Sequence, residues 1–195
     1  MGLIILVPGI DDTAKRMEFI NIQLSIAGYE NIHTVEIVPN NGSISIIDMA
    51  RQVLKRILKL REQMGEEEII DIIGYSMGAI VLRYIIQRLD GKEIFHRFVS
   101  IAAPHKGTIT GYFRNGIGVR QMRPNSTLLK ELNQEKNPWG KVKVYSFWTP
   151  LDLMVLPSKS SELEGAVNKT YFVLCHPCMT RSKRVIKGII QALQS

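Results

Sequence analysis

Residues 69–84, IIDIIGYSMGAIVLRY, change from strand-forming to helix-forming composition at a serine. The part before the serine is rich in isoleucine, which favours strands, and the part after it has a helical pattern. Gly74-Tyr75-Ser76-Met77-Gly78 stands at the junction. Glycines two residues before and two residues after a serine are typical of a turn so sharp that side chains there would clash. The pentapeptide therefore predicts a strained strand-to-helix turn at Ser76.

The rest of the chain repeats this alternation of strand and helix. Short apolar runs predict six strands, at residues 2–7, 33–38, 68–73, 97–102, 142–148 and 170–175. Helical patterns fall between and after them, at about 13–27, from Ser43 or Ser45 onward, at 77–89 and at 179–193. This alternation is typical of a mostly parallel sheet with helices on both faces. We expect a single α/β domain over residues 1–195.

Residues that cap helices mark three of the helix boundaries. Asp11 or Asp12 is expected to cap the first helix at its N-terminus, and Gly28 is expected to end it. Asp90-Gly91 is expected to end the helix that follows Ser76.

Residues 104–140 interrupt the alternation, because they have little strand pattern and many turn formers. Only STLLKELNQ, residues 126–134, looks helical there. A long irregular insertion in a compact domain is more often functional than idle, so a cap-like or site-lining role is expected. Its apolar side chains would either contact a substrate or pack beneath the loop; they are Ile109, Tyr112, Phe113, Ile117, Val119 and Met122. Whether the insertion is a mobile lid is left open.

Composition narrows the class of protein. No apolar run approaches the length of a membrane span, and MGLIILVP lacks the flanking features of a signal peptide, so a soluble protein is expected. Both cysteines lie in CHPC, as Cys175 and Cys178, and one pair makes no disulfide framework; this favours a cytoplasmic location. A zinc site would need a second ligand cluster, which the sequence lacks, so no metal is expected. The role of the cysteine pair is left open.

The formal net charge of +7 lies in the second half of the chain. Residues 99–195 carry 14 Lys and Arg against 5 Asp and Glu. A basic half could contact an anionic membrane surface weakly. The basic residues are scattered and match no nucleic-acid-binding motif, so no nucleic-acid partner is expected.

The serine at the turn needs a base, because a serine hydroxyl is a poor nucleophile until a neighbour takes its proton. In an open parallel sheet, ligands bind at the carboxyl edge of the strands. His33 precedes a predicted strand and His96 lies beside charged residues just before another, so neither is favoured. His105 and His176 both follow strands, but only His176 comes after the acid in the order Ser, Asp, His. His176 is the predicted base, with His105 as the alternative.

The acid that orients the histidine is expected soon after the fifth strand, where Asp152 lies. Glu162 and Glu164 are the alternatives. Asp71 lies inside an apolar strand, either as a bordering polar group or as a buried carboxylate that needs partners. Its role is left open.

Two backbone N–H groups are expected to form an oxyanion hole. Met77 begins the helix after Ser76, where free N–H groups and the helix dipole favour negative charge. Ile10 follows Gly9 in the loop after the first strand, which is where the second donor is expected.

Taken together, the motifs LVPGI, GYSMGA, SIAAPHKGT, RPNSTLLKELN and TPLDLMVLP, followed by His176 and a final helix, resemble the α/β-hydrolase superfamily. The nearest resemblance is to small lipases and esterases of the lipase class 2 and GPI inositol-deacylase-like groups, and it covers nearly the whole chain. It implies that His105 to Thr108 shape the wall of the site without joining a catalytic triad. Pro8 and Tyr75 stand where such proteins usually have histidine, and neither position belongs to the triad.

The resemblance implies a serine hydrolase that cleaves an ester or lipid through an acyl-enzyme, with Ser76, His176 and Asp152 as its triad and no cofactor. A thioesterase, phospholipase or amidase with the same triad is an alternative. An inactive hydrolase-fold binding module is a further alternative. The natural substrate, the acyl-chain preference and the oligomeric state are left open.

Overall fold

The computed structural model describes residues 2–65 and 69–195, and within them one sheet contains six strands. The strands are β1 (Leu3–Val7), β2 (Ile32–Thr34), β3 (Ile70–Tyr75), β4 (Phe95–Ile101), β5 (Lys143–Trp148) and β6 (Val167–Thr170). Their order is β2-β1-β3-β4-β5-β6, and each neighbouring pair is parallel. The predicted parallel α/β architecture is confirmed.

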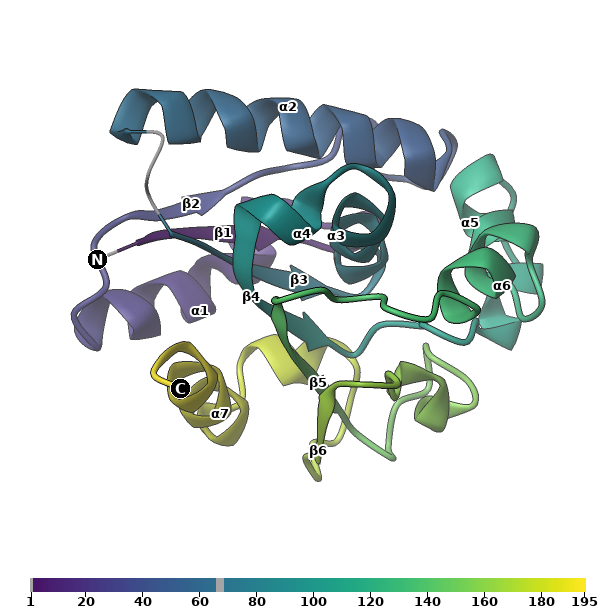
Figure 1. Ribbon diagram of the computed structural model, residues 1–195. Coiled ribbons are helices and arrows are strands. Elements are labelled where there is room, and N and C mark those ends of the chain that lie inside the picture. Colours follow the sequence, from purple (N-terminus) through teal and green to yellow (C-terminus); the bar gives the residue numbers. More distant parts are fainter. Residues whose placement is uncertain (1, 66–68) are drawn as a thin grey trace.

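Helices cover both faces of the sheet (Figure 1). They are α1 (Ala14–Ile26), α2 (Ile46–Met64), α3 (Met77–Arg88), α4 (Gly91–Ile94), α5 (Ile117–Gln121), α6 (Thr127–Asn133) and α7 (Lys183–Leu193), with 3-10 turns η1 (Ile109–Tyr112), η2 (Ser158–Ser161) and η3 (Pro177–Thr180). α2 and α3 pack in one apolar layer, and α1 and α7 pack in the other. No helix in the described ranges has both the length and the apolar composition to cross a bilayer.

The second strand is shorter than predicted: β2 ends at Thr34, whereas the sequence predicted a strand to residue 38. Val35 and Ile37 still point into the core. Val38, however, exchanges both backbone hydrogen bonds with the side chain of Gln52 on α2. The apolar residues after Thr34 therefore pack in the core as part of a loop. At Val38, the side chain of Gln52 provides the hydrogen bonds that a neighbouring strand would otherwise provide.

The last strand is also displaced. β6 covers Val167–Thr170, whereas residues 170–175 were expected. β6 is an edge strand that is largely exposed, so it does not need an apolar sequence. The apolar residues that suggested a strand, Tyr171 and Val173, pack instead against the layer of α1 and α7.

Helix boundaries agree with the sequence at three points and differ at two. Ser45 caps α2 by accepting the N–H of Asp48, and Gly28 follows α1 with a positive φ of 92°. The predicted caps at Asp11 and Asp12 are wrong, because their carboxylates pair with Arg114 and Arg16. Thr13 is the N-cap residue instead. α3 ends at Arg88, just before residues 90–91. The last helix begins at Lys183 instead of residue 179, because η3 precedes it. Residue 68 of the third predicted strand lies outside the described residues.

The insertion at residues 104–140 lies at the carboxyl edge of the sheet, where it forms η1, α5 and α6 (Figure 1). The N–H of Gly118 donates to the carbonyl of Gly42, which ties α5 to the loop that precedes α2. Thr108, Val119 and Met122 line the same cleft as Ser76. The insertion therefore forms a wall beside the turn at Ser76.

Candidate active site

Ser76 lies at the apex of the turn between β3 and α3. Its backbone has φ 53° and ψ −122°, a left-handed conformation that residues with side chains rarely adopt. A Cβ at Gly74 would lie 2.5 Å from the Cα of Ala79, and one at Gly78 would lie 2.3 Å from the carbonyl oxygen of Pro8. Both contacts are with backbone atoms, so only glycine fits at either position.

The turn places Ser76 at the N-terminus of α3, a helix of 12 residues. Met77 is the first residue of that helix, and its N–H has no intrahelical acceptor. Ile10, after β1, lines the same cleft as Ser76. Within the described residues, no hydrogen bond uses the N–H of Ile10. Both residues thus have backbone donors to offer an anion that forms beside Ser76.

His176 and Asp152 form a buried pair. Nδ1 of His176 lies 2.6 Å from Oδ2 of Asp152, where Nδ1–H donates to the carboxylate. Oδ1 of Asp152 accepts the backbone N–H groups of Met154 and Val155, at 2.8 and 2.9 Å. These contacts satisfy both carboxylate oxygens and fix the orientation of the imidazole.

Tyr75 connects this pair with Ser76. Its ring is buried against the imidazole of His176, with ring centroids 4.9 Å apart, and its backbone adjoins Ser76. Burial raises the pKa of the Tyr75 phenol, and the carboxylates of Asp12 and Asp152 raise it further. Tyr75 therefore stays neutral. No hydrogen bond joins the Ser76 hydroxyl to His176 in residues 2–65 and 69–195.

A cleft of about 160 Å³ opens at Ser76. It is lined by Ile10, Ser76, Pro104, Thr108, Thr110, Gly111, Arg114, Val119, Met122, Leu153, Met154 and Val155. Of the residues predicted to bind substrate, Met122 and Val119 line it. Ile109, Tyr112, Phe113 and Ile117 do not; their side chains are exposed instead. Ile109 and Tyr112 lie on η1, Phe113 follows it, and the guanidinium of Arg123 lies over the ring of Tyr112, 4.9 Å from its centroid.

His105 lies behind the wall of the cleft and is fully buried. Its Nε2 pairs with the hydroxyl of Ser100 at 2.7 Å, and its Nδ1 has no hydrogen-bond partner among the described residues. Burial lowers the pKa of His105 well below its usual value, and the positive charges of Arg83 and Lys106 lower it further. His105 is therefore neutral and does not line the cleft, whereas Thr108 does.

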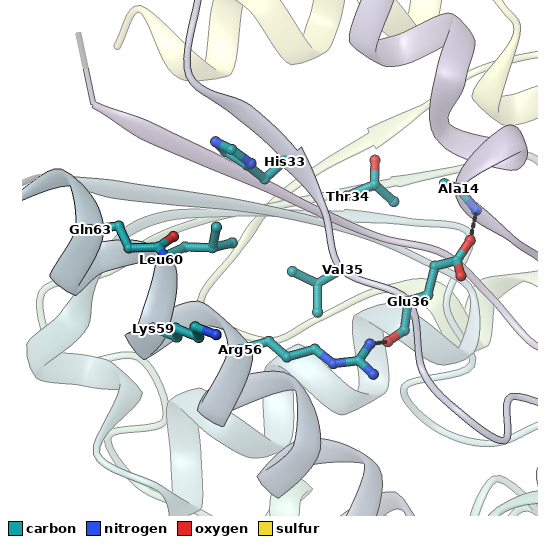
Figure 2. A pocket seen from close by; sticks show the side chains of 9 residues that line it. All are labelled: Ala14, His33, Thr34, Val35, Glu36, Arg56, Lys59, Leu60 and Gln63. Atoms are coloured by element: carbon teal, nitrogen blue, oxygen red, sulfur yellow. Dashed lines mark hydrogen bonds between the residues drawn. The ribbon is translucent and has the colours of Figure 1, made fainter.

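The other two histidines lie away from Ser76. His33 lines a separate cavity of about 480 Å³ between β2 and α2 (Figure 2), and the residues around it include no serine or cysteine. There Glu36 accepts the N–H of Ala14, while its carbonyl accepts a hydrogen bond from Arg56. His96 lies at the start of β4, at the amino edge of the sheet.

The remaining carboxylates also lie elsewhere. Glu162 and Glu164 line a different cavity, beside Trp139. Asp71 pairs with Arg97 on the neighbouring strand, through contacts of 3.1 and 3.3 Å. Burial raises the pKa of Asp71, and Arg97 opposes that rise. Asp71 is therefore a buried carboxylate with a partner, at the sheet edge opposite Ser76.

Sequence reasoning missed two contacts around the cleft. Arg114 lines the cleft and pairs with Asp11 at 2.7 Å, which links the insertion to the loop after β1. Cys175 and Cys178 are joined by a disulfide that encloses His176. The spacing of CHPC is the signal that could have suggested the disulfide. No sequence signal pairs residue 11 with residue 114.

Comparisons with known proteins show the family and the fold of the chain. The family model described as palmitoyl protein thioesterase matches residues 3–137. No curated protein matches the sequence. The mature form of the Bacillus licheniformis lipase BlEst2 superposes with a TM-score of 0.82 at 12% identity, covering 100% of this chain and 92% of that one. Lipase B of Aspergillus fumigatus gives 0.84 at 15% identity, with 100% and 52% covered.

A Listeria innocua protein gives a TM-score of 0.76 at 12% identity, with 100% of this chain and 94% of that chain covered. At such identities the structural likeness shows the fold, which is that of the α/β-hydrolases. The family model covers well over half of the residues. The chain therefore belongs to the palmitoyl protein thioesterase family.

Proposed function

We propose that this protein is a serine hydrolase that cleaves carboxylic esters through an acyl-enzyme. Ser76 is the nucleophile, His176 the general base and then the general acid, and Asp152 the residue that orients and stabilises the imidazole. Met77 and Ile10 hold the oxyanion with their N–H groups. No cofactor takes part.

The observation that carries this proposal is the buried hydrogen bond between His176 and Asp152. In a neutral imidazole that donates through Nδ1, the lone pair is on Nε2. Tyr75 packs on that imidazole and is the residue next to Ser76. As the substrate binds, the Ser76 hydroxyl passes its proton to Nε2. Such contacts are often long before substrate is present and tighten only in the complex.

The reaction proceeds in two steps. Ser76 Oγ attacks the carbonyl carbon, and the negative charge on the carbonyl oxygen is held at the N-terminus of α3, a contribution worth about 3 kcal/mol per donor. His176 then gives its proton to the leaving group. Water, deprotonated by the same imidazole, releases the acid from Ser76.

A thioester substrate is the second candidate, and the match to the palmitoyl protein thioesterase model favours it. The triad chemistry is the same for both, since the attacked atom is a carbonyl carbon in each case. A phospholipase or amidase would use these residues in the same way. An inactive binding module would have no need for the full set of Ser76, His176 and Asp152.

The acyl group is proposed to be apolar. The hydroxyls of Thr108 and Thr110 both donate hydrogen bonds to the carbonyl of Met154. These hydroxyls are therefore already paired, and most of the cleft wall presents carbon atoms to a ligand. At about 160 Å³ the cleft is smaller than the 300–1,000 Å³ of typical ligand sites. A long acyl chain would therefore extend onto the exposed side chains of Ile109 and Phe113 nearby.

Those side chains belong to an apolar rim, which we define as the exposed residues Ile109, Tyr112, Phe113, Leu151, Leu153, Met154, Phe172 and Leu174. Hydrogen bonds connect its segments: Ile109 donates to Leu156, and Thr149 donates to Val173. Such a patch suits a lipid surface, and the basic second half suits an anionic one. We propose weak contact with anionic membranes and a cytoplasmic location.

Labelling with a fluorophosphonate tests the nucleophile. The wild-type protein should be labelled and Ser76→Ala should not, while Ser160→Ala, another buried serine, should be labelled like wild type. Turnover of p-nitrophenyl butyrate should follow the same pattern. Equal labelling of Ser76→Ala and wild type would reject Ser76 as the nucleophile.

A further inference from the structure

His176 lies inside a ring closed by a disulfide. Cys175 and Cys178 are bonded to each other, with Cα atoms 5.1 Å apart, so the ring contains only His176 and Pro177 besides the two cysteines. Within the ring, the N–H of Cys178 donates to the carbonyl of Cys175 at 3.1 Å. The disulfide and this hydrogen bond together set the backbone direction at His176.

Noncovalent contacts also hold this segment, since His176 is buried against Tyr75 and Asp152 and η3 packs against α1. Hydrogen bonds join the start of this segment to β5 and the loop after it. The N–H of Tyr171 donates to the carbonyl of Trp148, and the backbone of Val173 exchanges hydrogen bonds with the hydroxyl of Thr149. Leu174, the residue before the ring, is among the most exposed apolar residues of the protein. His176 is itself buried, and Met179 is the next buried residue after it. Between Val173 and Met179 the disulfide is therefore the one covalent constraint beyond the backbone itself.

The imidazole depends on that backbone for its position. Nδ1 reaches Asp152 at 2.6 Å, and the ring packs on Tyr75 with centroids 4.9 Å apart. Asp152 and Tyr75 are both buried and lie outside the disulfide ring, Tyr75 on β3 and Asp152 in the loop after β5. Of the partners in these contacts, His176 is the one whose backbone lies inside the disulfide ring. Displacing a catalytic group by about 1 Å can cost a hundredfold in rate.

Reductants can reach the sulfur atoms, because Cys175 and Cys178 are both partly exposed. In a cytoplasmic protein, disulfides are usually transient and serve catalysis or redox sensing. The two cysteines flank His176 in the sequence, so a change in their redox state changes the backbone constraint on the proposed base.

We propose that Cys175 and Cys178 form a redox-modified site that controls hydrolysis by fixing or releasing His176. This inference rests on the proposed function. A thiolate of a dithiol reductant attacks one sulfur of the pair, the Cys175–Cys178 bond breaks, and a mixed disulfide forms. The second thiol of the reductant displaces the protein sulfur. Two electrons and two protons pass to the cysteines, and the reductant leaves as a disulfide. A disulfide oxidant reverses the reaction.

The test compares the two redox states of the wild-type protein. One sample is oxidised with diamide and the other reduced with dithiothreitol and desalted under nitrogen, and thiol titration verifies each state. Reduction should lower kcat/KM for p-nitrophenyl butyrate about tenfold, since the base is loosened but not removed. Reoxidation should restore it. The double variant Cys175→Ser/Cys178→Ser should have the kcat/KM of reduced wild type, and neither diamide nor dithiothreitol should change that value.

Hydrogen exchange supplies a readout that does not depend on turnover. Amides of residues 171–182 should exchange faster after reduction, while those of 184–193 in α7 should not change. An unchanged kcat/KM in protein with two titrated thiols would overturn the proposal, as would failure of diamide to form the disulfide.

A protein that hydrolyses no ester in either state, with Ser76 unlabelled by fluorophosphonate, would reject the proposed function instead. The exchange experiment would then still decide whether the cysteine pair orders the His176 segment. Equal exchange in both states would overturn that part as well. The double variant is compared by circular dichroism, and the wild-type experiment stands even where that variant does not fold.

Discussion

His176 Nδ1 lies 2.6 Å from Asp152 Oδ2, and each side chain has only 2% of its surface exposed. The imidazolium that forms when His176 takes a proton would be costly in so buried a place without an adjacent carboxylate. Asp152 is itself held by two backbone N–H groups, from Met154 and Val155. The carboxylate is therefore oriented toward the histidine before any substrate binds.

Asp152→Asn should lower kcat for short esters by about 10⁴-fold. The neutral amide cannot stabilise the imidazolium, and it favours the wrong tautomer of His176. The measurement is initial-rate kinetics with p-nitrophenyl butyrate. Glu162→Gln is the matched control and should keep near-wild-type rates, because Glu162 lines another cavity. Loss of activity in Glu162→Gln with retention in Asp152→Asn would exchange the two roles.

Gly78→Ala should destabilise the protein by about 3 kcal/mol, because the new Cβ would overlap the backbone carbonyls of Pro8 and Val7. Gly28→Ala is the control. It meets no atom within 4 Å, so only its positive φ of 92° should cost energy, about 1–2 kcal/mol. Chemical denaturation measures both values. A Gly78→Ala protein as stable as Gly28→Ala would show that the turn can relax.

Local sequence sufficed where a few residues determine a local geometry. Gly74 and Gly78 predict the turn at Ser76 because their spacing around a serine is a local sequence pattern, although the backbone that a Cβ would meet is local only for Gly74, at Ala79, and comes from Val7 and Pro8 for Gly78. The core strands were also predicted well, since β1, β3 and β5 are buried along nearly their whole lengths. The edge strand β6 was misplaced because it need not be apolar.

Contacts between distant segments were harder to predict. The partner of Asp71 is Arg97, and that pairing depends on the register of β3 and β4. The same limit applies to the insertion, where the direction taken by η1 decides that Phe113 is exposed while Met122 lines the cleft. Apolar composition alone could not distinguish these two outcomes.

Stability should fall as the pH drops below about 6.5, and His105 should contribute to that fall. Its folded pKa lies well below the unfolded value, because burial and the charge of Arg83 disfavour the imidazolium. At a pH between the folded and unfolded pKa values of His105, the imidazole is protonated in the unfolded chain and neutral in the folded protein. Each pH unit of decrease in that window therefore removes up to about 1.4 kcal/mol of stability.

His105→Gln should flatten this part of the profile, since glutamine does not titrate and can still hydrogen-bond to Ser100. Urea denaturation between pH 4.5 and 8 measures the slope. Ester hydrolysis at pH 8 should remain largely intact in His105→Gln and be abolished in His176→Ala. If the slopes of wild type and His105→Gln are equal, then His105 does not govern the acid sensitivity.

The apolar rim should bind anionic vesicles. Phe113, Leu153 and Leu174 are 86%, 78% and 84% exposed, and burying each in lipid would stabilise the bound state by about 1.5 kcal/mol or more. Replacing all three with aspartate should reduce partitioning onto phosphatidylglycerol vesicles at least about tenfold, because the apolar contact is lost and like charges repel. Cosedimentation measures the partitioning.

Ile26→Asp is the matched control, because Ile26 is 75% exposed but ends α1, away from the cleft. It should bind vesicles like wild type. Added salt should weaken the binding of wild type, since the basic second half of the chain contributes screened attraction. Ser76 of the triple variant should still be labelled by fluorophosphonate, because none of the three positions belongs to the proposed triad; turnover of p-nitrophenyl butyrate should fall, since Leu153 lines the cleft. Equal partitioning of the triple variant and Ile26→Asp would exclude the rim as the membrane-facing surface.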